Sequence, residues 1–198
     1  MKKYELTSAT KVFNGVELHR IKALESFGNI EEGDWGGWIE SEKNLSQDGC
    51  AWVYDNATVC GNATVCDNAT VCGNAFISGN AKVGGDAKVG GYAWVCENAI
   101  VDRNAIVERN TIVYGNAVVG GDATVRGQED YIVFKNWWSS GRFFTWTRSN
   151  NKWSVGCFYG SGEELIAKAY EDSAKSGREY ERVVKYVESI LKEENNNK

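Results

Sequence analysis

A six-residue phrase, repeated thirteen times between residues 51 and 126, constrains this chain more than any other feature. Its commonest wording is Ala-x-Val-x-x-Asn, as in Ala57-Thr58-Val59-Cys60-Gly61-Asn62. Strand side chains alternate, so the small residue and the Val two places later share one face. One short strand and one corner cannot enclose a core, but three six-residue sides make a triangular coil of 18 residues, and stacked coils bury Ala and Val together. The repeat therefore predicts a mainly β protein, a parallel β-helix of about 4–5 coils.

The residue just before each Ala is predicted to form the corner between two strands. Asn and Asp tolerate the left-handed backbone that a tight corner needs, and Gly often stands one place earlier. The predicted corner residues are Asn56, Asn62, Asn68, Asn74, Asn80 and Asp86.

This pattern resembles the hexapeptide-repeat superfamily, whose members form left-handed parallel β-helices. The resemblance implies the handedness and a homotrimer, since the family's known enzymes are mostly trimeric acyltransferases, with gamma-class carbonic anhydrases as relatives. The chain also looks like hexapeptide-repeat proteins encoded by bacteriophages and prophages, in residues 36–40, 44–46, 52–57 and 155–160. This second resemblance implies a host protein as partner, such as a component of a bacterial antiviral defence system.

The segment before the repeat, residues 1–34, is predicted to be a hairpin that caps the open end of the β-helix. Asn14-Gly15 between two alternating stretches is a hairpin turn signal, and solenoids need their ends covered. The β-helix itself is assigned to residues 35–127. Its first units, at residues 37–39 and around Leu45, are imperfect, and a slip of two residues in the count predicts a bulge or loop there.

Residues 128–198 are predicted to form an α+β domain, a three-stranded antiparallel meander followed by two helices. The strands are expected at residues 131–134, 142–147 and 152–158. Two capping boxes are expected to open the helices, and residues 193–198 are expected to be frayed. These boxes are Ser161-Gly162-Glu163-Glu164 and Ser176-Gly177-Arg178-Glu179.

The formal net charge of −5 divides into −3 for residues 1–49, −2 for 50–127 and 0 for 128–198. Such a rod is neither basic enough to bind nucleic acid nor acidic enough to mimic it. The first residues lack a continuous apolar stretch and no segment is long and apolar enough to cross a membrane, which predicts a cytoplasmic protein without a signal peptide. The cysteines are expected to be free thiols, with Cys60, Cys66 and Cys72 pointing outward on three different sides, where they cannot share a metal.

The outward positions between Ala and Val change character along the repeat. They are mostly Thr and Lys at first, and then five consecutive ones are apolar. A soluble monomer seldom leaves so much apolar surface in water, so one side is expected to meet a symmetry mate and another to take the C-terminal segment. The predicted interface residues are Trp94, Ile100, Ile106, Ile112 and Val118.

The catalytic residues of the hexapeptide-repeat acyltransferases and gamma-class carbonic anhydrases have no counterpart on the coil. Those acyltransferases use a His as general base and the carbonic anhydrases use three His to hold a metal. This chain has one His, His19, in the predicted hairpin, where an ordinary strand residue is the favoured interpretation. We therefore predict no catalytic residues, no metal site and no cofactor.

Aromatic and arginine side chains alternate in the predicted meander. Such an arrangement could stack a base and pair with a phosphate, which makes Trp137, Arg142, Trp146 and Arg148 the candidate ligand-binding residues. The favoured interpretation is that most of the rings form the core between the sheet and the helices.

Three hypotheses follow. The first is a non-catalytic, oligomeric binding protein directed at a host protein. The second is an acyltransferase with an unrecognised base, and the third is a nucleotide-sequestering protein with its ligand between subunits.

Overall fold

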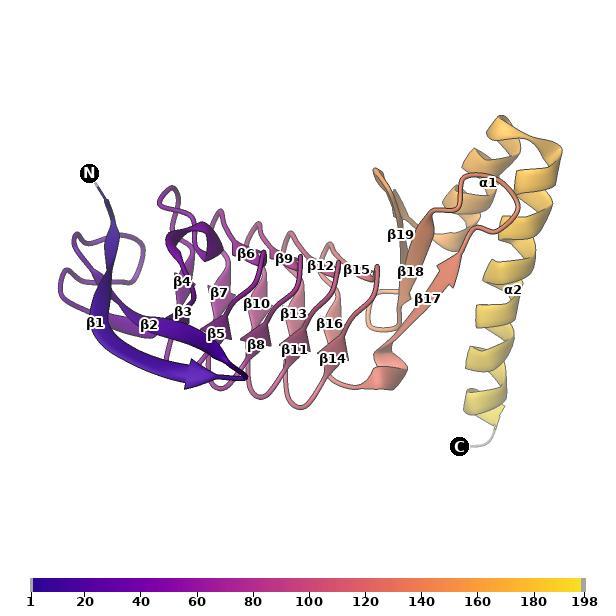
Figure 1. Ribbon diagram of the computed structural model, residues 1–198. Helices are drawn as coiled ribbons and strands as arrows, with labels where there is room; N and C mark the ends of the chain where they lie inside the picture. Colours follow the sequence, from indigo (N-terminus) through magenta and orange to yellow (C-terminus); the bar gives the residue numbers. More distant parts are fainter. Residues whose placement is uncertain (1, 197–198) are drawn as a thin grey trace.

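The computed structural model describes residues 2–196 as a rod with three parts (Figure 1). A hairpin lies at one end, stacked coils form the shaft, and a sheet with two helices lies at the other end. None of the described helices is long and apolar enough to cross a membrane. Along the chain these parts follow the predicted order of a cap, a β-helix and an α+β segment.

The shaft contains thirteen two-residue strands, one for each hexad. They are β4 (Trp52–Val53), β5 (Thr58–Val59), β6 (Thr64–Val65), β7 (Thr70–Val71), β8 (Phe76–Ile77), β9 (Lys82–Val83), β10 (Lys88–Val89), β11 (Trp94–Val95), β12 (Ile100–Val101), β13 (Ile106–Val107), β14 (Ile112–Val113), β15 (Val118–Val119) and β16 (Thr124–Val125). Each strand pairs in parallel with the strand three hexads further on, as Thr58 pairs with Phe76 and Phe76 with Trp94. The predicted parallel β-helix is confirmed.

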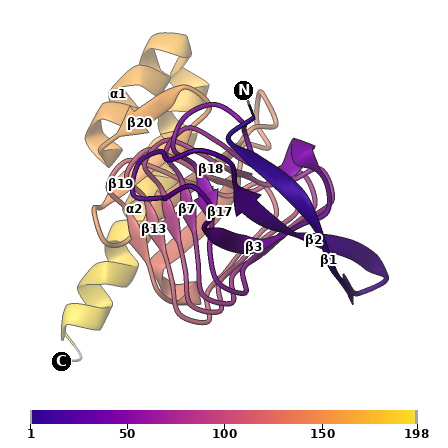
Figure 2. The same cartoon turned by 90° about the vertical axis from the view of Figure 1, so that its left-hand side faces the viewer.

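The strands form three sides. Side 1 holds β3 (Trp35–Ile39), β5, β8, β11 and β14; side 2 holds β4, β7, β10, β13 and β16; side 3 holds β6, β9, β12 and β15. Nearly all the inward Ala, Val and Ile side chains of these strands are at most 1% exposed and form one continuous core. From the N-terminal end, the coils are seen stacked behind one another (Figure 2). The small residue and the branched residue of each hexad thus together form the core of the whole shaft.

The corners are built one residue earlier than the sequence predicts. Positive φ angles fall on Asp55 (53°), Gly61 (67°) and Arg103 (63°), each two places before the inward Ala, so the prediction for the Asn positions is wrong. The Asn backbone instead pairs with the next coil, and its side chain joins a ladder. Asn62 donates from Nδ2 to Oδ1 of Asn80 at 3.2 Å. Amide side chains can donate and accept at once, which suits a repeating column.

The N-terminal hairpin is confirmed, with β1 (Tyr4–Phe13) and β2 (Val16–Ala23) joined by Asn14 (φ 51°) and Gly15 (φ 79°). Strand β2 pairs antiparallel with β3, so the hairpin continues side 1 and projects past the coils (Figure 2). It thereby covers the exposed edge of the first strand on this side.

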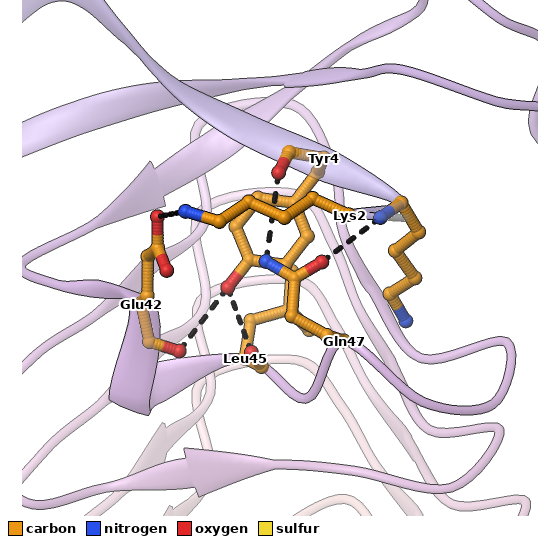
Figure 3. Close-up of polar contacts among 6 residues, drawn as sticks. Lys2, Tyr4, Glu42, Leu45 and Gln47 are labelled. Atoms are coloured by element: carbon orange, nitrogen blue, oxygen red, sulfur yellow. Dashed lines mark hydrogen bonds and ion pairs between the residues drawn. The ribbon is translucent and has the colours of Figure 1, made fainter.

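The N-terminal segment also plugs the first coil. The Tyr4 hydroxyl donates to the carbonyl oxygens of Leu45 (2.7 Å) and Glu42 (3.1 Å), beside the 3₁₀ turn η1 (Glu42–Asn44) (Figure 3). The Trp52 ring lies edge-on to the rings of Tyr4 and Phe27, at 6.1 and 5.4 Å. Trp52 occupies an outward position of the repeat, between Ala51 and Val53, but it is 1% exposed because residues distant in the sequence cover it.

The C-terminal sheet has four strands rather than the predicted three. Its elements are η2 (Gln128–Asp130), β17 (Tyr131–Lys135), β18 (Phe143–Thr147), β19 (Lys152–Val155) and β20 (Phe158–Gly160). The predicted third strand is broken at Gly156, whose φ of 56° reverses the chain between β19 and β20.

Two helices follow, α1 (Gly162–Asp172) and α2 (Ala174–Asn196). The capping box at Ser161 is confirmed, since its Oγ accepts from the Glu164 N–H at 3.2 Å. The second box is wrong: Ser173 Oγ accepts from the Ser176 N–H at 3.1 Å, and α2 has already begun at Ala174. The expected fraying of residues 193–198 is also wrong for residues 193–196, which are helical, while 197 and 198 lie outside the described residues.

The C-terminal domain lies across the end of the shaft. The N–H of Val118 donates to Thr145 Oγ1 at 2.8 Å, and the N–H of Thr124 donates to Ser149 Oγ at 2.7 Å. Backbone groups that the last strands would leave unpaired therefore find side-chain partners. The prediction that this segment covers a side of the coil is wrong, because it caps the end (Figure 1).

Candidate functional site

The outer face of side 1 carries a column of large side chains. Because residues 18 apart pair directly, Phe76, Trp94 and Ile112 lie one above another on β8, β11 and β14. The ring centroids of Phe76 and Trp94 are 5.3 Å apart, with an angle of 56° between the rings. The parallel register thus converts three positions of the repeat into one continuous apolar strip.

The hairpin tip extends this column. The Phe13 ring lies 5.3 Å from the Phe76 ring, although Phe13 is on the edge strand β1 and β8 is four strands further along the sheet. Next to it, the Lys11 ammonium lies 4.5 Å above the Trp38 ring and donates to Thr58 Oγ1 at 3.4 Å. Burial lowers the pKa of this lysine. The hairpin therefore packs onto the column without covering its far half.

We define the side-1 apolar face as Phe13, Phe76, Trp94 and Ile112. Trp94 is 45% exposed, Phe13 and Ile112 are about as exposed, and Phe76 is half-buried. Sides 2 and 3 carry Lys88 and Lys82 at the corresponding positions. Side 1 is thus the face on which exposed aromatic groups gather, and Tyr and Trp are the residue types enriched where proteins bind one another.

The predicted interface residues do not share one face. Trp94 and Ile112 are exposed on side 1. Ile106 lies on side 2, and Ile100 and Val118 lie on side 3, all three half-buried. The sequence analysis named two members of the side-1 face, Trp94 and Ile112, and missed Phe13 and Phe76. The signal for Phe13 was its place beside the Asn14-Gly15 turn, which puts it at the hairpin tip.

The predicted ligand-binding residues are separated. Trp146 is 1% exposed and donates from Nε1 to Asn151 Oδ1 at 2.8 Å. The Arg148 guanidinium lies 5.7 Å from the Trp146 ring and is paired with Glu194 at 2.6 Å.

Elsewhere in the domain, Trp137 is 75% exposed on the loop after β17, and its ring meets that of Trp138. Arg142 lines a different cavity, between that loop and the helices. The structure therefore brings Trp146 and Arg148 together and places Trp137 and Arg142 apart from them.

The titratable groups along the shaft are not arranged for nucleophilic chemistry. Cys60 is buried and Cys66 and Cys72 are half-buried. The Cys66 and Cys72 thiols lie over glycines of the next coil: a Cβ at Gly84 would be 3.3 Å from Cys66 Sγ. Burial, with a hydrogen bond to Asp67, raises the Cys66 pKa to about 11, which keeps the thiol protonated at neutral pH.

His19 lies on β2, where its Nδ1 is 3.4 Å from the Thr7 carbonyl oxygen. It is half-buried and forms no ion pair with a carboxylate within residues 2–196. No cluster of three His, Cys, Asp or Glu side chains suited to a metal ion occurs among the described residues.

The fold defines the class of protein, a β-solenoid built from six-residue repeats with a C-terminal antiparallel sheet and two helices. No protein-family model matches the chain. One relative, described as an uncharacterized acetyltransferase, is YdcK of Escherichia coli (strain K12), 33% identical over 67 residues. The match covers 30% of this chain and 21% of the relative, so the chain spans about a fifth of that protein's length. The similarity connects the chain to an acetyltransferase and gives no support for a phage origin.

Proposed function

We propose that the protein is a non-catalytic, oligomeric binding protein that assembles through the side-1 apolar face. The observation that carries this proposal is the apolar column of half-buried Phe76 with exposed Trp94 and Ile112, prolonged by Phe13 of the hairpin. Apolar patches of this kind mark interaction surfaces on soluble proteins. A trimer and a host protein as further partner belong to the same proposal, and both rest on the resemblances of the sequence.

The test is the oligomeric state of the purified chain with and without a charge on the face. Sedimentation velocity of the wild-type chain should give a species larger than the 21.9 kDa monomer. Trp94→Asp should weaken assembly at least about tenfold, because burying an unpaired carboxylate in an apolar interface costs several kcal/mol. Trp94 is already half in solvent, so the circular dichroism spectrum should stay that of the wild type.

The matched control is Lys88→Asp, which places the same charge at the equivalent exposed position on side 2. This variant should assemble like the wild type. A monomeric wild-type chain at tens of micromolar, or an equal effect of the two variants, would refute assembly through side 1.

Acyl transfer is the second candidate function, because the relative is described as an acetyltransferase. Such a reaction needs a base that takes the proton of the acceptor as it attacks the thioester. His19 is the histidine that could serve, and it stands on the hairpin rather than on the coil. Release of free coenzyme A from acetyl-CoA with amine acceptors, lost in His19→Ala, would establish this activity and overturn the non-catalytic proposal.

A further inference from the structure

The C-terminal domain contains a cavity of about 350 Å³ that lies away from the side-1 apolar face. Its walls come from the loop between β17 and β18, from β19 and β20, and from helices α1 and α2. In Figure 1 that loop lies beside the two helices at the far end of the rod. The volume falls in the range of pockets that hold small organic molecules.

Two unpaired cations line the cavity. Neither Arg142 on the loop nor Lys168 on α1 forms an ion pair or a side-chain hydrogen bond within residues 2–196. Three other cations of this domain, Arg148, Arg182 and Lys185, are paired with carboxylates, whereas Arg142 and Lys168 share one cavity. Two cations left free at the same cavity favour an anionic occupant.

Hydroxyl groups supply further donors. The Tyr180 hydroxyl accepts from Asn136 Nδ2 at 3.3 Å, which leaves its own hydrogen free to donate. Asn136 is 2% exposed and is itself held by Ser139, whose N–H and Oγ both donate to Asn136 Oδ1. The Ser176 hydroxyl lines the same cavity and has no hydrogen-bond partner in the described chain. These donors are therefore positioned before any ligand arrives.

The remaining walls are apolar and indicate an organic ligand. Phe158 and Val155 come from the sheet, and Leu165 and Ala169 from α1. One carboxylate, that of Asp172, stands at the cavity and is unpaired in the described residues, so it can accept a hydrogen bond from a ligand hydroxyl. Two cations against one carboxylate leave the site with a net positive charge.

We propose that this cavity binds a small organic anion, with its phosphate or carboxylate group held by Arg142 and Lys168 and its apolar part against Phe158. Bidentate recognition of such a group is the particular capacity of the arginine guanidinium. The hydroxyls of Tyr180 and Ser176 would complete the coordination of the anion.

Isothermal titration calorimetry in a phosphate-free buffer tests this site with three probes of similar size. Phenyl phosphate and benzoate carry the anion on an aromatic ring, and benzylamine carries the opposite charge. We expect one or both anions to bind, and the tighter of the two identifies the anionic group. Arg142→Gln should weaken that binding at least tenfold, because it removes the guanidinium that holds the anion. The variant should still fold, because the Arg142 side chain forms no ion pair or hydrogen bond in the described chain.

The control is Lys192→Gln, which removes one positive charge from an exposed position near the far end of α2. This variant should bind like the wild type. The proposal is overturned if neither anion binds at millimolar concentration, if the two variants bind the anion equally, or if benzylamine binds as tightly as the anions. Unchanged melting temperatures of both variants show that the cavity itself remains folded.

Discussion

Gly121 forms a close contact between the shaft and the C-terminal domain. A Cβ built on Gly121 would lie 1.8 Å from the Tyr159 hydroxyl oxygen, so Gly121→Ala forces this ring to move. The hydroxyl donates to Asp122 Oδ1 at 3.2 Å and accepts from Asn150 Nδ2 at 2.9 Å. Moving the ring breaks both hydrogen bonds.

The size of the effect can be worked out from these contacts. Gly121 has a φ of 67°, and an L-residue in the left-handed region costs about 1–2 kcal/mol. The two hydrogen bonds, which lie partly in solvent, add about 1–2 kcal/mol. Gly115 is the matched control, with a φ of 70° and no atom nearer to a built Cβ than 3.9 Å. Gly121→Ala should therefore lower the free energy of unfolding by about 1–2 kcal/mol more than Gly115→Ala.

Urea denaturation followed by tryptophan fluorescence measures both losses. In a Tyr159→Ala background the obstacle is gone, and Gly121→Ala should then cost no more than Gly115→Ala. Equal losses for the two glycine changes in the wild-type background would refute the reasoning, because they would show that Tyr159 does not constrain the corner.

Two further predictions concern the shaft. Thr111 is 1% exposed and its hydroxyl has no partner among the described residues, so Thr111→Val should raise the free energy of unfolding by about 1–2 kcal/mol in urea denaturation, and a decrease would contradict this. Burial raises the pKa of Cys66 from 9.0 to about 11, so iodoacetamide at pH 8 should alkylate it far more slowly than exposed Cys157, as measured by peptide mass spectrometry. Equal alkylation rates for Cys66 and Cys157 would count against this burial. Because the pKa of Cys66 is higher in the folded than in the unfolded state, its contribution to stability is present below pH 9 and is lost as the pH rises towards about 11.

The shaft could be predicted because each hexad by itself determines one short strand and one corner. Ala57 and Val59 alternate as a strand requires, and copies 18 residues apart must stack to bury them. The predicted corner is one residue too late. Asn is common just before the inward Ala and tolerates the left-handed backbone, but the residue before it, even Arg103, is the one that adopts that backbone. The burial of Trp52 depends on Tyr4, and no local pattern shows a contact over such a distance.

The candidate site was predictable only in part. Trp94 and Ile112 could be recognised as outward and apolar from their place in the hexad. Their partner Phe13 comes from the hairpin, and the repeat pattern does not predict that the hairpin tip reaches Phe76 on β8. Arg142 was singled out beside Trp146, but the fold turns the loop away from the buried ring and places this cation near Lys168 instead.

The seal at the end of the shaft has a consequence for how such a chain can change in evolution. Thr145 and Ser149 pair with the backbone N–H groups of Val118 and Thr124 in the final coil, which disfavours the addition of a strand from another molecule there and so the growth of a filament. New length can enter only in the middle. A duplicated block of 18 residues between β8 and β14 would add one whole turn and leave the contacts of both terminal domains unchanged.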